Sequence, residues 1–103
     1  MLLSPIPLRS ERRALQSAMM EALAAMRAAS LSRQVALCRL KDGERRARAR
    51  GLETSVAEAA VSPLRRAFLD ASVEAGRKET AWERARAAYL AASAEAARRR
   101  GRA

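Results

Sequence analysis

This chain of 103 residues contains few side chains of the types that catalyse reactions. Cys38 is the single cysteine, and the sequence contains no histidine that could remove the proton of its thiol. These counts also exclude metal sites built from histidine and cysteine, and disulfide bonds within the chain. Glu79 and Glu83 share one face of a helix, but Lys78 and Arg84 stand beside them, which is typical of a solvated helix surface. The sequence therefore predicts no catalytic residues, no metal site and no cofactor.

Basic residues are the most prominent polar feature, and they give the chain a net charge of +10. The largest cluster precedes a glycine at position 51 and contains Arg39, Lys41, Arg45, Arg46, Arg48 and Arg50. A second cluster near the last residue contains Arg98, Arg99, Arg100 and Arg102. Such clusters bind acidic protein surfaces or nucleic acid phosphates, and they also occur as solvated faces of arginine-rich helices. The sequence leaves all three interpretations open.

The elements that position these residues follow from a heptad repeat. The only aromatic residues, Phe68, Trp82 and Tyr89, are separated by fourteen and seven positions, so they share one heptad phase. Continued in steps of three and four, this phase contains Val61, Leu64, Phe68, Ala71, Ala75, Lys78, Trp82, Ala85, Tyr89, Ala92 and Ala96. An equivalent series in the first half contains Leu15, Met19, Ala22, Met26, Ala29, Arg33, Ala36, Leu40, Gly43 and Ala47. Each series predicts a long helix that presents one apolar seam to a partner helix.

Proline, glycine and capping residues predict where these helices begin and end. Gly51 follows a basic run and suits the left-handed position after a helix, whereas Gly43 is expected to be a weak point inside the first helix. Ser62 and Pro63 have the types expected at an N-cap and at the first helical position. Ser55 and Glu58 have the spacing of a capping box and could form a short turn over 55–61 that runs into the second helix with a bend at Pro63. The predicted segments are an extended start over residues 1–8, a helix over 9–50, a connector over 51–62, a helix over 63–98 and a basic tail over 99–103.

A connector of this length allows the two helices to fold back on each other. The predicted fold is therefore all-α, an antiparallel two-helix coiled-coil hairpin. Both seams alternate larger side chains with alanine, which allows two helix backbones to approach while the larger side chains interdigitate. In this arrangement the arginines near residue 98 would lie close to residues 1–13. A rod of this kind acts more often by contacting other proteins than by enclosing a substrate.

Six larger apolar residues of the first helix lie outside its seam, namely Met20, Leu23, Leu31, Val35, Leu37 and Cys38. Leu31, Val35 and Cys38 recur in steps of four and three and form a second stripe. Because a two-helix hairpin covers one face of each helix, the stripe either docks a partner or joins the seam through gradual drift of the heptad phase. The candidate partner-binding residues are Leu31, Val35, Cys38, Arg39, Lys41, Arg45, Arg46, Arg48 and Arg50.

The sequence also bears on where the protein acts. Its first residues lack a basic lead and a long apolar run, and no stretch approaches the roughly 20 apolar residues of a membrane-spanning helix. A single cysteine indicates no dependence on oxidation. The sequence therefore predicts a cytoplasmic protein without membrane insertion.

Residues 81–89 (AWERARAAY), together with the rod-like pattern and the basic bend, resemble the FliJ/YscO-like stalk proteins of type III secretion and flagellar export. The resemblance extends over residues 9–98. It implies a non-enzymatic cytoplasmic coiled coil that sits in or on a hexameric export ATPase, couples it to the membrane export gate and can contact chaperones.

Two other functions remain open from the residues alone. The arginines of 39–50 and 98–102 could bind nucleic acid without sequence specificity, and such binding would weaken steeply with salt. Alternatively, two hairpins could pair through Leu31, Val35 and Cys38 into a homodimeric four-helix scaffold.

Overall fold

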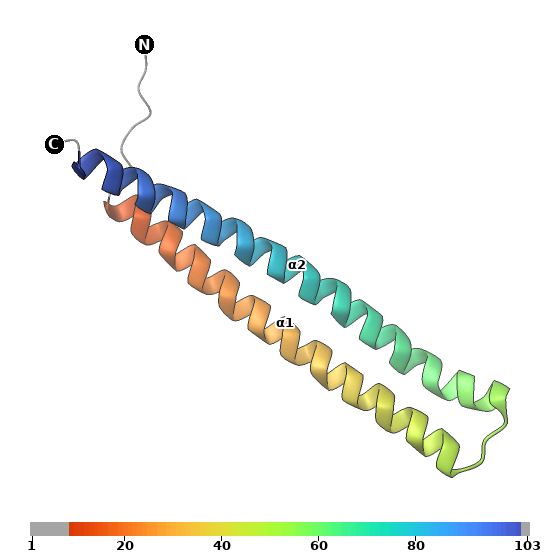
Figure 1. Ribbon diagram of the computed structural model, residues 1–103. Helices are drawn as coiled ribbons and strands as arrows, with labels where there is room; N and C mark the ends of the chain where they lie inside the picture. Colours follow the sequence, from red (N-terminus) through yellow and green to blue (C-terminus); the bar gives the residue numbers. More distant parts are fainter. Residues whose placement is uncertain (1–8, 102–103) are drawn as a thin grey trace.

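The computed structural model describes residues 9–101 as two helices joined by a short loop. Helix α1 comprises Arg9–Ala49 and helix α2 comprises Thr54–Gly101. The helices lie side by side and antiparallel, with the loop at one end and the start of α1 beside the end of α2 at the other (Figure 1). We call these the loop end and the open end. The fold is the predicted all-α, two-helix hairpin.

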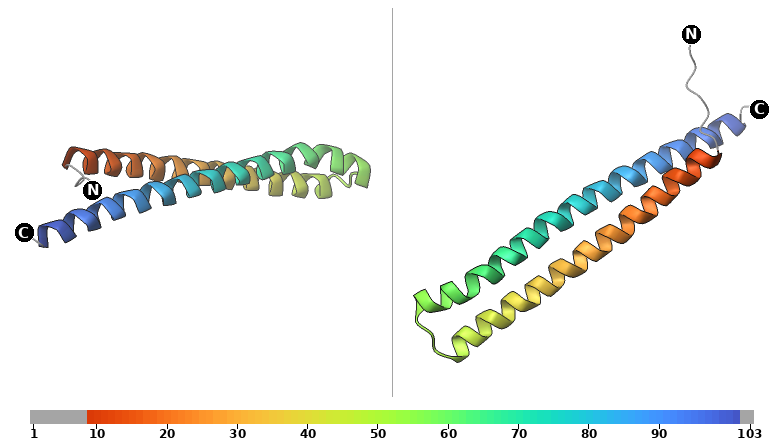
Figure 2. Two further views of the ribbon diagram at one scale, coloured as in Figure 1. Left: turned by 90° about the horizontal axis from the view of Figure 1, so that it is seen from above. Right: turned by 180° about the vertical axis from the view of Figure 1, so that it is seen from behind.

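The molecule is a rod of 75 × 23 × 17 Å. Figure 2 shows the two helices crossing at a shallow angle, as expected when helices pack in the coiled-coil manner.

Burial follows the predicted heptad seam in both helices. Every predicted seam residue of α2 is buried or half-buried, and Val61 and Ala96 are only 5% and 4% exposed. In α1 the same holds for every seam position except Arg33. The Arg33 guanidinium lies 5.1 Å from the centroid of the Phe68 ring, and its Nε donates to Ser72 Oγ at 3.0 Å. Arg33 therefore contributes to the contact between the helices from its exposed position.

The best-buried residues lie toward the loop end. Leu40, Ala47 and Val61 form a buried cluster, against which Leu52, Ala57, Leu64 and Phe68 pack. Gly43 belongs to the same part of the seam, and a Cβ atom added there would overlap Leu64 Cδ1. Helix α1 is continuous through Gly43. This glycine is therefore a position of close packing and does not break the helix.

Gly51 ends α1 in the way that the sequence predicts. It has a φ of 61°, in the left-handed region, and its N–H donates to the Arg48 carbonyl at 3.1 Å. The Leu52 N–H donates to the Ala47 carbonyl at 3.3 Å, which completes a Schellman motif. Leu52 also packs against the buried cluster, an apolar contact that commonly accompanies this motif. Helix α1 thus ends at Ala49, one residue before the predicted boundary.

The start of the second helix differs from the prediction. Helix α2 begins at Thr54, so the connector is the loop 50–53 and not residues 51–62. The prediction that Ser62 caps this helix and that Pro63 occupies its first position is wrong, because Pro63 lies inside α2.

Local packing explains why Pro63 does not start the helix. Proline cannot donate to the carbonyl of Ala59, four residues earlier, but Ala59 is exposed, so water can hydrate that group. Val61 is buried in the cluster and Ala57 packs against it. These contacts hold the residues before Pro63 in helical form.

The predicted end segments fall partly outside the part of the chain that the structure describes. The extended segment predicted over residues 1–8 lies outside it, as do residues 102–103 of the predicted tail. Residues 99–101, also predicted as tail, belong to α2. Within residues 9–101, neither helix contains a stretch apolar enough to cross a bilayer.

Candidate interaction sites

The apolar stripe predicted on α1 is exposed to solvent. Leu31 is 65% exposed and Val35 is 42% exposed, and Cys38 is exposed as well. Two other apolar residues outside the predicted seam, Leu23 and Leu37, are half-buried. Leu23 and Leu37 are fourteen residues apart and directly follow the seam residues Ala22 and Ala36, so they flank the seam, whereas Leu31, Val35 and Cys38 lie on the face of α1 turned away from α2.

A matching apolar pair, which the sequence analysis did not identify, lies on α2. Leu69 and Val73 are each 54% exposed, and their spacing equals that of the leucine and valine in the α1 stripe. Arg33, between the two residues of the α1 pair, donates to Ser72, between those of the α2 pair, so the pairs lie at nearly the same height. We call these four side chains, Leu31, Val35, Leu69 and Val73, the apolar belt. The height of Leu69 and Val73 relative to the α1 pair is set by how the two helices align. A pattern within one helix therefore could not show that the two pairs lie at nearly the same height.

The six predicted cations do not form a single patch. Lys41, Arg45 and Arg48 line a shallow groove of about 170 Å³ together with Glu44. Their spacing of four and three places them on one flank of α1.

The remaining three cations lie elsewhere. Arg39 and Arg46 are seven residues apart and therefore lie on one face of α1. Each is two residues from a member of the first group, so this face lies on the opposite flank of the helix. Arg50 follows the last residue of α1, and its N–H donates to the Arg46 carbonyl at 3.0 Å. The predicted basic bend is thus divided between two flanks and the loop.

Carboxylates neutralise part of the loop end. Asp42 pairs with Arg45, and Arg65 of α2 donates to Glu58 at 3.0 Å. The bond from Arg65 lowers the pKa of the Glu58 carboxyl below its usual value. A groove of about 260 Å³ beside the loop is lined by charged side chains of both signs and by apolar residues of the buried cluster. The loop end is therefore a mixed-charge surface with an apolar floor.

The open end carries a groove that the sequence analysis did not assign as a site. It has a volume of about 200 Å³ and is lined by Arg9, Arg12, Arg13, Gln16, Tyr89, Ser93 and Arg100. Antiparallel packing brings the first turns of α1 against the last turns of α2, so residues from the two ends of the described chain line one groove. The Nε atom of Arg12 is buried and has no hydrogen-bond partner within residues 9–101. We call this the arginine groove.

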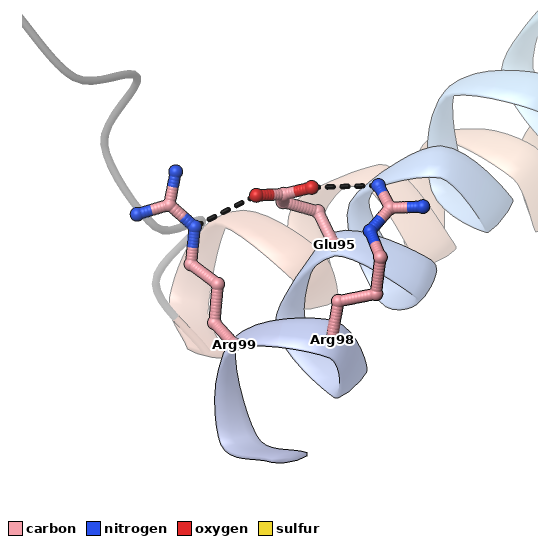
Figure 3. A network of polar contacts seen from close by, with 3 residues as sticks. All are labelled: Glu95, Arg98 and Arg99. Atoms are coloured by element: carbon pink, nitrogen blue, oxygen red, sulfur yellow. Dashed lines mark hydrogen bonds and ion pairs between the residues drawn. The ribbon is translucent and has the colours of Figure 1, made fainter. Parts of the chain in front are cut away.

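Two further arginines at the open end are held by a carboxylate. Figure 3 shows Glu95 between Arg98 and Arg99, with 2.6 Å from Arg98 Nη2 to Glu95 Oε2 and 2.7 Å from Arg99 Nε to Glu95 Oε1. These hydrogen bonds, from Arg99 and Arg98, lower the pKa of the Glu95 carboxyl to about 2. The four arginines of the groove differ, since they form no ion pair with a carboxylate of the described residues.

Other kinds of site have less support. Residues 9–101 contain no group of three or more histidine, cysteine, aspartate or glutamate side chains that could hold a metal ion. Comparison of the chain with known protein families, curated proteins and solved structures gives no match. The apolar belt, the loop end and the arginine groove are the features from which a function can be inferred.

Proposed function

We propose that the chain is a non-enzymatic coiled-coil stalk protein that binds protein partners of a type III-like export apparatus in the cytoplasm. Its partners are the hexameric export ATPase and the export gate, between which the hairpin acts as a coupling rod. The 75 Å length of the rod supports this role, because partners bound at different heights do not compete for one surface.

The apolar belt is the observation that carries the proposal. Its side chains are between 42% and 65% exposed and occupy the outer faces of both helices at nearly the same height. Burial of one such side chain against a partner contributes about 1.5–3 kcal/mol when it is complete, and proportionately less for a partly covered one. A partner that surrounds the rod, such as a ring-shaped hexamer, covers both outer faces at once. The belt therefore supports a surrounding partner over a single one-sided groove.

The loop end supports a protein partner more than a nucleic acid. Its cations alternate with four carboxylates, Asp42, Glu44, Glu53 and Glu58. Arg45 and Arg65 are already in ion pairs. These carboxylates repel a phosphate backbone, whereas a protein surface can present both signs of charge in a complementary arrangement.

Binding of the purified hairpin to a purified export ATPase tests the proposal. We expect the variant Leu31→Ser with Val35→Ser to bind at least about tenfold more weakly, since it removes apolar contact from one face. The variant Leu69→Ser with Val73→Ser should lose a similar factor, because a surrounding partner also covers α2. Leu90→Ser is the matched control, since Leu90 is 46% exposed on α2 outside the belt. Circular dichroism checks that each variant remains helical.

The charged loop end is tested by the same assay. Replacing Arg45, Arg46 and Arg48 with glutamate should abolish the complex, because like charges across an interface cost several kcal/mol and slow the encounter. Raising the salt concentration should weaken the wild-type complex less than this reversal does.

Three outcomes would contradict parts of the proposal. If only the variant Leu31→Ser with Val35→Ser loses affinity, the partner binds one side of the rod and does not surround it. If the wild-type chain is a dimer in sedimentation and the variant Leu31→Ser with Val35→Ser is a monomer, the homodimeric scaffold would be favoured. Tight binding to random duplex DNA that weakens steeply with salt, with no binding to the ATPase, would overturn the export role and favour a nucleic-acid-binding protein.

A further inference from the structure

We infer that the arginine groove at the open end binds a compact anion that carries several phosphate charges. The groove lies at the opposite end of the rod from the loop, and the inference does not depend on the proposed export role.

The first support is the set of donors that converge on the groove. Arg9, Arg12 and Arg13 reach it from the first turns of α1, and Arg100 reaches it from the last turns of α2. Each guanidinium presents a planar fork of N–H donors that matches the spacing of phosphate oxygens. Four such forks around about 200 Å³ provide more donors than a single phosphate group can accept. This arrangement favours an anion with more than one phosphate.

The second support is a buried donor in the groove, whose four arginines form no ion pair within residues 9–101. Three arginines elsewhere, Arg45, Arg66 and Arg77, pair with an acid three or four residues away, and most of the others form no ion pair within residues 9–101, so the lack of an ion pair does not by itself distinguish the groove. At the open end Glu95 is occupied by two other arginines (Figure 3). Glu95 is not among the residues that line the groove. Arg12 Nε is buried without a hydrogen-bond partner within residues 9–101. A buried donor without an acceptor is unfavourable, so a movement of the Arg12 side chain that brings Nε onto an anionic oxygen in the groove would be favourable.

The charge distribution along the rod favours a compact anion over a nucleic acid. Between the two ends, residues 17–38 and 71–88 carry six Lys/Arg and four Asp/Glu, so no continuous cationic track leads away from the groove. Binding of a nucleic-acid backbone requires such a track, because it engages several successive phosphates. Helix α1 also begins at the groove, and the positive end of its dipole adds to the attraction for an anion.

Calorimetric titration of the full-length chain with inorganic tripolyphosphate tests the inference. We expect one site per chain, and an affinity that falls at least about tenfold in Arg12→Gln and in Arg13→Gln, because each loses charge-assisted hydrogen bonds. Arg12→Lys should also weaken binding, since lysine keeps the charge but lacks the planar fork and the Nε donor. Arg98→Gln is the charge-matched control. It removes the same charge from the same end, but its side chain binds Glu95 outside the groove, so its affinity should stay close to that of the wild type.

The possible results separate a site from general attraction between charges. Equal losses in Arg98→Gln and Arg13→Gln would reduce the effect to net charge and overturn the inference, as would an absence of binding at physiological salt. Preference for duplex DNA over tripolyphosphate would overturn it in favour of nucleic acid. Binding to phosphoinositide vesicles that tripolyphosphate displaces would support the groove and assign its phosphates to a lipid headgroup. Arg13 is exposed, so Arg13→Gln remains decisive if Arg12→Gln unfolds the open end.

Discussion

Two glycines inside the helices provide a direct test of the helix register. Gly43 of α1 lies against Leu64 of α2, and a Cβ atom added there would overlap Leu64 Cδ1. Gly76 of α2 is exposed, and an added Cβ atom would meet nothing within 4 Å. Substitution with alanine therefore changes helix propensity equally at both positions, while the packing changes only at Gly43.

The two effects have comparable and opposite magnitudes. Replacing glycine with alanine inside a helix stabilises a protein by about 1 kcal/mol, so Gly76→Ala should raise the free energy of unfolding by about that amount. At Gly43 the same gain is opposed by overpacking, which typically costs about 1–3 kcal/mol. Because the overlapped atom is the end of a flexible leucine side chain, we expect Gly43→Ala to change the free energy of unfolding by about 0 to −2 kcal/mol.

Urea unfolding followed by circular dichroism, at one fixed protein concentration, measures both variants. In a Leu64→Ala background the added methyl group has room, and Gly43→Ala should then stabilise the chain by about 1 kcal/mol. If Gly43→Ala alone stabilises the chain as much as Gly76→Ala does, Leu64 does not pack on Gly43 and the register of the hairpin is wrong.

Three further predictions concern the helices themselves. Pro63→Ala should raise the free energy of unfolding by about 1–3 kcal/mol, because it restores the hydrogen bond to the Ala59 carbonyl, and a loss of stability would place a helix start at Pro63. Phe68→Ala should lower the free energy of unfolding by about 3 kcal/mol, since its ring packs on the buried cluster, and a loss below about 1 kcal/mol would place the ring on the surface. Glu95→Gln should lower the melting temperature most above pH 4.5, because the folded-state pKa of Glu95 is lowered from 4.5 to about 2. The difference from wild type should shrink as the pH falls toward 2, and a difference that stays constant between pH 7 and pH 2 would contradict the role of the Glu95 ion pairs.

The fold could be predicted because a heptad seam carries its information locally. Every predicted seam position of α2, and all but Arg33 in α1, is buried or half-buried, so the period alone identified which faces meet. Arg33 departs from the pattern because a long side chain can leave the seam and still cover a ring, here that of Phe68.

The start of α2 was predicted wrongly because a local rule was preferred over the period. The steps of three and four that link Val61, Leu64 and Phe68 also extend back to Ala57, which packs against the buried cluster. This continuation signals a helix before Pro63. Proline at the first helical position is a strong local preference, but tertiary packing outweighs it here.

The candidate sites were only partly readable because they depend on which residues the hairpin brings together. The stripe containing Leu31 and Val35 could be found within one helix, but its counterpart on α2 becomes meaningful only when the register fixes its height. Likewise, Arg12 and Arg100 form one groove only after the chain has folded back on itself. Sequence patterns describe single helices, whereas these surfaces combine two.

The two ends of the rod carry a comparable excess of positive charge but suit different kinds of ligand. Residues 39–70 at the loop end hold eight Lys/Arg and five Asp/Glu, whereas 9–16 and 89–101 at the open end hold six and two. A partner at the loop end has to match a pattern of both signs, which favours another protein. An anion at the open end meets arginines without carboxylate partners among the described residues, which favours phosphate. The 75 Å rod is far longer than the screening length of about 8 Å at physiological salt, so charge bound at one end has little direct effect on the other. A phosphate anion and a protein partner could therefore occupy the same hairpin at once.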